Sequence, residues 1–178
     1  MMNSNLTITL VKAEDAATVL AFEQENRSHF EEWIASRGDE FYNLPEVRSS
    51  LEQAQYLANA KREYHYLAWV GGEVVGRLTL RGVEQDQYHK AFLGYRFSQR
   101  HGGHGYATAA VNAVVAQAFD EFKLNRIEAV VIIDNLPSQA IMRKCGFSEY
   151  GHSHASVHRN GLWMDMLHYE KLNTVRPA

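Results

Sequence analysis

The feature that constrains this chain most is a cluster of glycines placed directly before its most regular helical pattern. Gly102, Gly103 and Gly105 stand between a strand pattern and a helix predicted over residues 106–122. The apolar residues of that helix step by three and by one, which makes one continuous face; they are Ala107, Ala110, Val111, Val114, Val115, Ala118, Phe119 and Phe122. Glycines let a ligand approach the backbone, and the N–H groups at a helix start favour an anion. With Arg100 adjacent, the stretch predicts a phosphate or pyrophosphate loop, the alternative being a turn that binds nothing.

Two common phosphate loops fit this stretch poorly. A Walker loop ends in Gly-Lys-Ser/Thr, and no lysine lies between Gln99 and Thr108. A dinucleotide fingerprint that starts at Gly103 would place Thr108 at its third glycine. The strand before the loop is also predicted to be the third of a meander, whereas the fingerprint follows the first strand of a parallel unit.

Hydrophobic periodicity predicts the remaining elements of the chain. Strands are expected over residues 6–11, 64–70, 74–80, 89–97 and 127–133. Two helices are expected within residues 14–37, one after Pro45, and a short one over residues 137–145 that Gly146 ends. A hairpin around Asn160-Gly161 closes the chain. This order predicts an α/β fold of the α+β type with a mostly antiparallel sheet, and 178 residues predict one domain over residues 1–178.

Composition narrows the class of protein. The net charge of -3 argues against a direct nucleic-acid partner, because phosphate contacts require a basic surface. A single cysteine excludes an internal disulfide framework and a zinc site built on cysteine pairs. Neither a signal segment nor an apolar run of about 20 residues is present, so we expect a cytoplasmic protein with no membrane partner.

The glycine loop and the segments around it resemble the GNAT superfamily of acyl-CoA-dependent N-acyltransferases. Residues Arg100–Gly105 match the family's Q/R-x-x-G-x-G/A loop. Further segments match in the family's order: Leu93–Phe97, Gly105–Val111, Asn125–Ala129, Asn135–Ser138, Arg143–Phe147 and the hairpin Asn160–Trp163. The resemblance covers about residues 6–172 and looks like the RimJ/RimL branch, which acetylates N-terminal amino groups of ribosomal proteins. It implies the GNAT fold, a twisted, mostly antiparallel sheet flanked by helices.

This resemblance also implies acetyl-CoA as cosubstrate, with no metal. By position, backbone groups near Phe97 would pair with the pantetheine arm, and Asn135 and Ser138 would meet that arm near the thioester. The pyrophosphate would be held by the loop and the helix start, that is, by Arg100, Gly102, Gly103, His104, Gly105, Tyr106, Ala107 and Thr108.

The residue that donates a proton to the departing thiolate is harder to identify from the resemblance. Many family members carry a tyrosine seven residues after the asparagine, and this chain has Met142 there, which cannot donate. In the RimJ/RimL branch the serine of Asn-x-x-Ser is the usual alternative, so by resemblance Ser138 takes the catalytic role together with Asn135. A hydroxyl that satisfies backbone donors at a helix start is the structural alternative, and the two roles are compatible.

No general base stands out. Some relatives place a glutamate five residues before the asparagine, where this chain has Val130, and Glu128 is better explained as a structural residue. An α-amino group has a pKa of about 7.7–8.0 and a lysine one of about 10.4, so far more of an α-amine is already neutral near pH 7. Cys145 at a helix end is expected to be buried and unreactive, which implies direct transfer in a ternary complex.

Four functions therefore stay open. The leading one is an N-acetyltransferase that acts on the α-amino group of a protein, ribosomal proteins being the type case. The others are an acetyltransferase for a small amine, a non-catalytic acyl-CoA-binding module, and a histidine-rich metal protein. Residues 1–45 carry eight acids and three bases, which predicts either an acidic lip for a cationic acceptor or a solvated helix face. The protein is expected to be a monomer or a homodimer.

The chain contains nine histidines. His152, His154 and His158 have even spacing on one predicted strand and therefore share a face. The sequence offers no nearby carboxylate or cysteine to complete a clear ligand set. A solvated strand face is therefore expected, with a role in deprotonation or acceptor contact as the alternative.

Overall fold

The computed structural model describes residues 6–159 and 161–175. Its helices and strands are, in chain order, β1 (Leu6–Leu10), α1 (Ala16–Glu31), α2 (Leu44–Asn59), β2 (Tyr64–Val70), β3 (Glu73–Glu84), β4 (Lys90–Phe97), α3 (Tyr106–Asp120), β5 (Arg126–Ile132), α4 (Leu136–Lys144), β6 (Ser148–Arg159) and β7 (Leu162–Leu172). Short 3-10 turns cover residues 13–15, 39–41 and 99–101. None of the described helices combines the length and apolar composition needed to cross a membrane.

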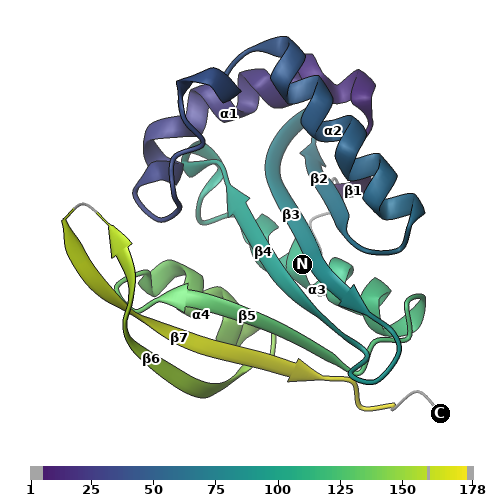
Figure 1. Cartoon of the computed structure of the whole chain (residues 1–178), viewed down its shortest axis with the longest axis vertical. Helices are drawn as coiled ribbons and strands as arrows, with labels where there is room; N and C mark the ends of the chain where they lie inside the picture. The colour runs from purple at the N-terminus through teal and green to yellow at the C-terminus, as the bar shows by residue number, and fades with distance from the viewer. Residues whose placement is uncertain (1–5, 160, 176–178) are drawn as a thin grey trace.

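The strands form one seven-stranded sheet in the order β1-β2-β3-β4-β5-β7-β6. All neighbouring pairs are antiparallel except β4 and β5, which are parallel. Helices α1 and α2 cover one face of β1–β4, and α3 lies behind the sheet (Figure 1). The apolar face predicted for α3 is buried against the strands. The predicted α/β fold with a mostly antiparallel sheet is confirmed.

The sheet divides into two arms where β4 meets β5. Strands β1–β4 with α1 and α2 are called the first arm, and β5, β7 and β6 the second arm. Between them, ladder pairing joins only Lys90–Phe92 of β4 to Arg126–Glu128 of β5. Beyond these three residue pairs the two strands diverge toward their carboxyl ends (Figure 1). This divergence positions the candidate site.

The segment over residues 14–37 differs from the sequence prediction of two helices. It forms the single helix α1, preceded by a 3-10 turn and followed by a loop. The chain turns at Gly38, which has a left-handed φ of 77° that a helix cannot use. Ile34 and Phe41 still pack against the apolar cluster under α1 and α2, so their apolar character reflects loop packing.

Helix ends follow the expected capping chemistry. The Asn43 side chain accepts a hydrogen bond from the Glu46 N–H at the start of α2, and Pro45 stands in the first turn. Gly146 has φ 75° directly after α4, as a glycine beyond a helix end requires. The predicted helix over residues 106–122 ends earlier, at Asp120. Of the predicted hairpin turn, Asn160 lies outside the described residues.

Candidate functional site

The divergence of β4 and β5 leaves two strand edges that are not paired with each other. β4 pairs with β3 along Arg81–Gly76, and β5 pairs with β7 along its whole length. The carboxyl ends of the two parallel strands lead into the glycine loop and into α4. A crevice outside the carboxyl ends of parallel strands, where neighbouring strands part, is where such sheets bind ligands. An extended ligand can pair there with strand backbone.

The glycine loop has the backbone that the sequence predicts. Gly103 and Gly105 have φ values of 77° and 79°, in the left-handed region that favours glycine. A Cβ placed on either glycine would meet no atom within 4 Å, so open space lies beside the loop. Gly105 is also the N-cap of α3 and provides no side-chain cap. The N–H groups of Tyr106, Ala107 and Thr108 lie in the first turn of α3, where backbone N–H groups have no intrahelical partner. They therefore form a suitable site for an anion.

The side chains of Arg100 and His104 in the loop have protein partners. Arg100 forms ion pairs with Glu73 at the start of β3 and, at 3.8 Å, with Glu25 of α1. The Nδ1 atom of His104 lies 2.9 Å from the Gly102 carbonyl oxygen, and its ring stacks on Tyr106 at a centroid distance of 5.6 Å. Arg100 is thus held at the loop by two carboxylates, and its predicted contact with a phosphate stays a prediction.

Asn135 and Ser138 meet at the first turn of α4. The Asn135 side chain accepts a hydrogen bond of 3.1 Å from the Ser138 N–H and so caps the helix. The hydroxyl of Ser138 lies 2.8 Å from the hydroxyl of Tyr95 on β4. The capping role that the sequence offered for Ser138 therefore belongs to Asn135. The Ser138 hydroxyl instead bonds to Tyr95 of the first arm.

Tyr95 was not identified from the sequence. Its hydroxyl also donates to the Ser138 carbonyl oxygen at 3.2 Å. Burial raises the pKa of Tyr95, and the hydrogen bond with Ser138 opposes this shift only in part. Strand alternation could have identified it, because Tyr95 shares a face with Phe97, two residues on. Tyr95 and Ser138 thus connect β4 to α4 across the gap between the two diverging strands.

Two residues considered in the sequence analysis as possible reactive groups, Cys145 and Glu128, have structural surroundings. Cys145 is 2% exposed, and burial raises the pKa of its thiol to about 11. Glu128 is 6% exposed and pairs with Lys90 and Arg126, which agrees with the structural role expected for it. The expected burial of Cys145 is confirmed, and its unreactive character stays a prediction.

A cavity of about 310 Å³ lies on the face of β3 and β4 that carries α1 and α2. Its walls come from β2, β3, β4 and the loop after α1; among the lining residues are Arg37, Glu63, His65, Arg77, Thr79, Arg81, Gly94 and Arg96. Four arginines line this cavity. The acidic residues of segment 1–45, which the sequence analysis considered as a lip for a cationic acceptor, are not among its lining residues. Glu23, one of the acids counted, is buried against Arg77 and Arg96, and Arg27 holds two others, Glu31 and Asp39.

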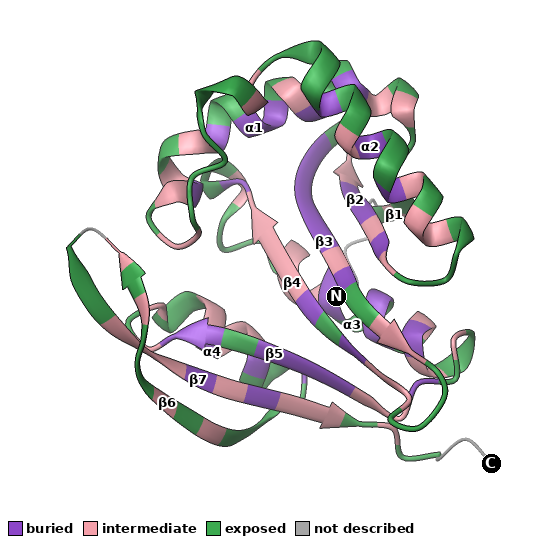
Figure 2. Cartoon of the chain, in the orientation of Figure 1, coloured by how far each residue is buried: buried purple, intermediate pink, exposed green. Residues whose placement is uncertain are grey.

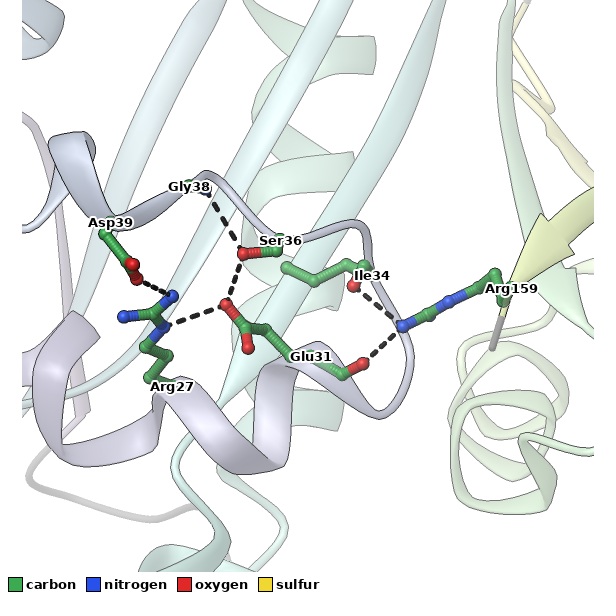
Figure 3. Close-up of polar contacts among 7 residues, drawn as sticks. All are labelled: Arg27, Glu31, Ile34, Ser36, Gly38, Asp39 and Arg159. Carbon is green, nitrogen blue, oxygen red and sulfur yellow. Dashed lines mark hydrogen bonds and ion pairs between the residues drawn. The ribbon is translucent and has the colours of Figure 1, made fainter. Parts of the chain in front are cut away.

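The tip of the second arm contacts the first arm beside this cavity. Arg159 at the end of β6 donates hydrogen bonds to the carbonyl oxygens of Glu31 and Ile34 (Figure 3). The same close-up shows the Glu31 carboxylate held by Arg27 and Ser36. Arg159 therefore fixes the loop that contributes Arg37 to the cavity.

The histidine cluster corrects a prediction. Asp165 on β7 lies 2.8 Å from His152 Nε2 and 3.0 Å from His154 Nδ1, so a carboxylate does accompany these histidines. One possible metal-ligand atom from each of His152, His154 and Asp165 lies within 4.8 Å of the other two. Asp165 also accepts a hydrogen bond from the Ala155 N–H, so three protein groups bond its carboxylate. His158 lies farther along β6, against Trp163 at a ring distance of 5.2 Å.

Comparisons with known proteins agree with this geometry. A family model described as "Acetyltransferase (GNAT) domain" matches residues 5–148. YjcK of Bacillus subtilis (strain 168), named as a probable N-acetyltransferase, is 33% identical over 157 residues, which is 87% of this chain and 87% of that protein. The ribosomal-protein-S5-alanine acetyltransferase from Vibrio fischeri has a similar fold, with a TM-score of 0.94 at 22% identity over 100% of this chain and 98% of that chain.

A further solved structure has both a similar fold and a higher identity. Mycobacterium smegmatis RimJ in complex with CoA-disulfide has a TM-score of 0.88 and 27% identity, over 94% of this chain and 81% of that chain.

Proposed function

Because the chain belongs to the GNAT acetyltransferase family, we propose that it transfers the acetyl group of acetyl-CoA to a primary amine, the α-amino group of a protein N-terminus. The observation that carries the proposal is the likeness to RimJ, which was solved with CoA-disulfide. It is supported by the glycine loop of this chain, which follows β4 where β4 and β5 diverge. The acceptor class rests on the likeness to the Vibrio fischeri enzyme, whose name specifies an alanine of a ribosomal protein.

The glycine loop suits a pyrophosphate on physical grounds. Gly103 and Gly105 leave open space beside the backbone, and the first N–H groups of α3 supply donors and the positive end of the helix dipole. In the proposal, strand backbone near Phe97 pairs with the extended pantetheine arm between β4 and β5. When bound there, acetyl-CoA supplies an acetyl group already activated as a thioester.

Ser138 is proposed as the proton donor. The amine nitrogen forms a bond to the acetyl carbon while the carbon–sulfur bond breaks. The amine loses one proton to water, and the departing thiolate takes one from the Ser138 hydroxyl, which water then replaces. Tyr95 is proposed to hold the Ser138 hydroxyl in place, because its raised pKa keeps it protonated at neutral pH. No covalent acyl-enzyme is involved, since the buried Cys145 thiol has a pKa of about 11.

The test is incubation with acetyl-CoA and a panel of acceptors, followed by mass spectrometry. The panel contains peptides with free α-amines, the same peptides blocked at the N-terminus with a lysine left free, and polyamines. We expect acetylation of the free α-amines. Acetylation of polyamines alone would instead make the protein a small-amine acetyltransferase, and binding of acetyl-CoA with no product would make it a non-catalytic module.

Two variants separate binding from chemistry. Gly103→Val should remove acetyl-CoA binding, seen as the loss of thermal stabilisation by acetyl-CoA, because a branched side chain strains the left-handed backbone and fills the space beside the loop. Ser138→Ala should retain that stabilisation and lose about 100-fold in turnover. Ser148→Ala, an exposed serine at the start of β6, is the matched control. Undiminished turnover in Ser138→Ala would remove Ser138 as the donor.

A further inference from the structure

The cavity beside β4 has a charge that the proposed function does not by itself require. Arg77, Thr79 and Arg81 alternate along β3 and point to the same face of the sheet. Arg96 lies directly opposite Arg77 in the β3–β4 pairing, and Arg37 approaches from the loop after α1. Arginines from three separate segments thus converge on a space of about 310 Å³.

Carboxylates of the described residues compensate this charge only in part. One oxygen of Glu23 accepts from both Arg77 and Arg96, the latter at 2.5 Å. Glu63 also lines the cavity, and it bonds His65 at 2.6 Å. Four guanidinium groups therefore face two carboxylates, and neither carboxylate bonds to Arg37 or Arg81 in the described contacts. A guanidinium stays protonated at any physiological pH, so the cavity carries a lasting positive charge.

Arg96 shows the consequence of this crowding. Burial and, after it, the positive charges of Arg77 and Arg37 lower the pKa of Arg96 to about 9, although Glu23 opposes the shift. Its Nε atom is buried and has no hydrogen-bond partner among the described residues. A negatively charged group in the cavity would relieve both the repulsion and the missing hydrogen bond.

The position of the cavity connects this charge to the acceptor. Gly94 and Arg96 belong to the part of β4 that has left β5, and the intervening Tyr95 bonds to Ser138. The cavity therefore borders the strand on which transfer is proposed. Its volume lies at the small end of ligand pockets, enough for an amino acid or the first residues of a peptide.

We propose that this cavity receives the acceptor, and that the acceptor carries a carboxylate near its amine, bound by Arg37, Arg81 and Arg96. The inference rests on the proposed acetyl transfer and names the substrate class within it. Planar guanidinium groups match a carboxylate with two parallel hydrogen bonds. The same positive charges lower the pKa of a nearby amine, so they favour the neutral, nucleophilic form that attacks the thioester.

The carboxylate has two chemical sources, which matched acceptors distinguish. A free amino acid supplies it as the α-carboxylate, and a peptide supplies it as an aspartate beside the N-terminus. We expect kcat/KM to fall about 10- to 100-fold when the responsible carboxylate becomes a carboxamide. The pairs are alanine against alaninamide, and Ser-Asp-amide against Ser-Asn-amide. The pair that shows the larger fall identifies the source.

Variants test whether the arginines cause this preference. Arg81→Gln and Arg37→Gln remove charge without touching the Glu23 bonds, and each should reduce the preference severalfold. Arg48→Gln, exposed on α2, is the control and should leave it unchanged. Equal kcat/KM for acid and amide, or a preference for a lysine beside the N-terminus, would overturn the proposal. Salt should weaken the preference, because screening acts on the charge.

Binding without turnover separates this inference from the proposed function. The probes are the acetylated forms of both pairs, N-acetylalanine against N-acetylalaninamide and acetyl-Ser-Asp-amide against acetyl-Ser-Asn-amide, measured by calorimetry with CoA present. Tighter binding of the acid, lost in Arg81→Gln, supports the anion site even if no acceptor is acetylated, a result that would refute only the acetyl transfer. Equal binding of acid and amide in both pairs refutes the anion site even if the parent amines are acetylated. Equally tight binding of inorganic phosphate would also overturn the choice of a carboxylate.

Discussion

Glu23 on the first arm and Asp165 on the second arm are each shared by two basic side chains, and the two sites differ in burial. Glu23 on the first arm is 1% exposed and lies between two arginines. Asp165 on the second arm lies at the surface between two histidines. Figure 2 shows the same contrast along the strands: half of β3 is buried, whereas β6 has no buried residue.

The difference shows how burial selects the partner of a carboxylate. A charge inside the protein needs a partner that keeps its own charge, and arginine does so at every physiological pH. At the surface water supports the carboxylate, so histidines suffice as its partners. The buried cluster should therefore determine stability and the shape of the acceptor cavity, and the surface cluster should respond to acid.

Removing the buried carboxylate should have the largest effect. Glu23→Ala leaves Arg77 and Arg96 facing each other without their shared partner, so we expect a loss of about 3–5 kcal/mol in the free energy of unfolding. Urea unfolding followed by circular dichroism measures it. Glu52→Ala, an exposed residue of α2, is the matched control and should change stability by less than about 0.5 kcal/mol. A loss below about 1 kcal/mol in Glu23→Ala would contradict the buried pairing.

A pair of glycines tests packing in the two arms with the same substitution. A Cβ on Gly76 of β3 would overlap the ring of Phe97, whereas one on Gly151 of β6 would meet only the His168 side chain, 3.6 Å away. Gly76→Ala should cost about 2 kcal/mol and weaken acetyl-CoA binding, because displacing the ring disturbs the Phe97 backbone with which the pantetheine arm is proposed to pair. Gly151→Ala should be neutral or slightly stabilising. Thermal unfolding with and without acetyl-CoA checks both, and equal effects would deny the contrast in packing.

Local sequence patterns predicted most of the elements because their causes are local. The predicted strand over residues 64–70 is β2 itself, and the glycine cluster marked the start of α3. The buried Glu23 cluster could not be predicted, since its arginines lie 54 and 73 residues away along the chain. The side chains of Arg77 and Arg81 could have been grouped by strand alternation, but not assigned to the acceptor side.

Asp165 was missed for a different reason. Near the turn, β6 and β7 pair in the register of a hairpin with a two-residue loop, with Val157 opposite Met164. Continued without interruption, that register places Ser153 opposite His168. The structure pairs Ser153 with Met166, because a bulge containing Ala155 at φ 46° adds residues to β6. This bulge brings Asp165 to the histidines, and a bulge without glycine leaves no clear mark in a sequence.

The contact between the arms should have a smaller effect than either change within the first arm. Arg159→Ala removes the hydrogen bonds to the Glu31 and Ile34 carbonyl oxygens, and we expect a loss of about 1 kcal/mol. Hydrogen exchange should become faster in the loop after α1, where Arg37 lies. Arg48→Ala is the control. Unchanged exchange in that loop would show that the tip of the second arm does not hold the cavity wall.

The smallest effect should come from Asp165, and it should depend on pH. The Ala155 N–H and, after it, the hydrogen bond with His154 lower the pKa of Asp165 to about 2. A carboxylate whose pKa is depressed in the folded protein adds stability above its unfolded pKa of about 3.9 and loses it as the pH falls toward 2. Asp165→Asn should therefore lower stability at pH 5–7 and converge with the wild type near pH 2. Urea unfolding across this range measures the difference in unfolding free energy between the variant and the wild type. A difference that stays constant down to pH 2 would show that the substitution acts through side-chain shape and not through charge. Because water already supports this surface carboxylate, the difference at neutral pH should remain well below that of Glu23→Ala.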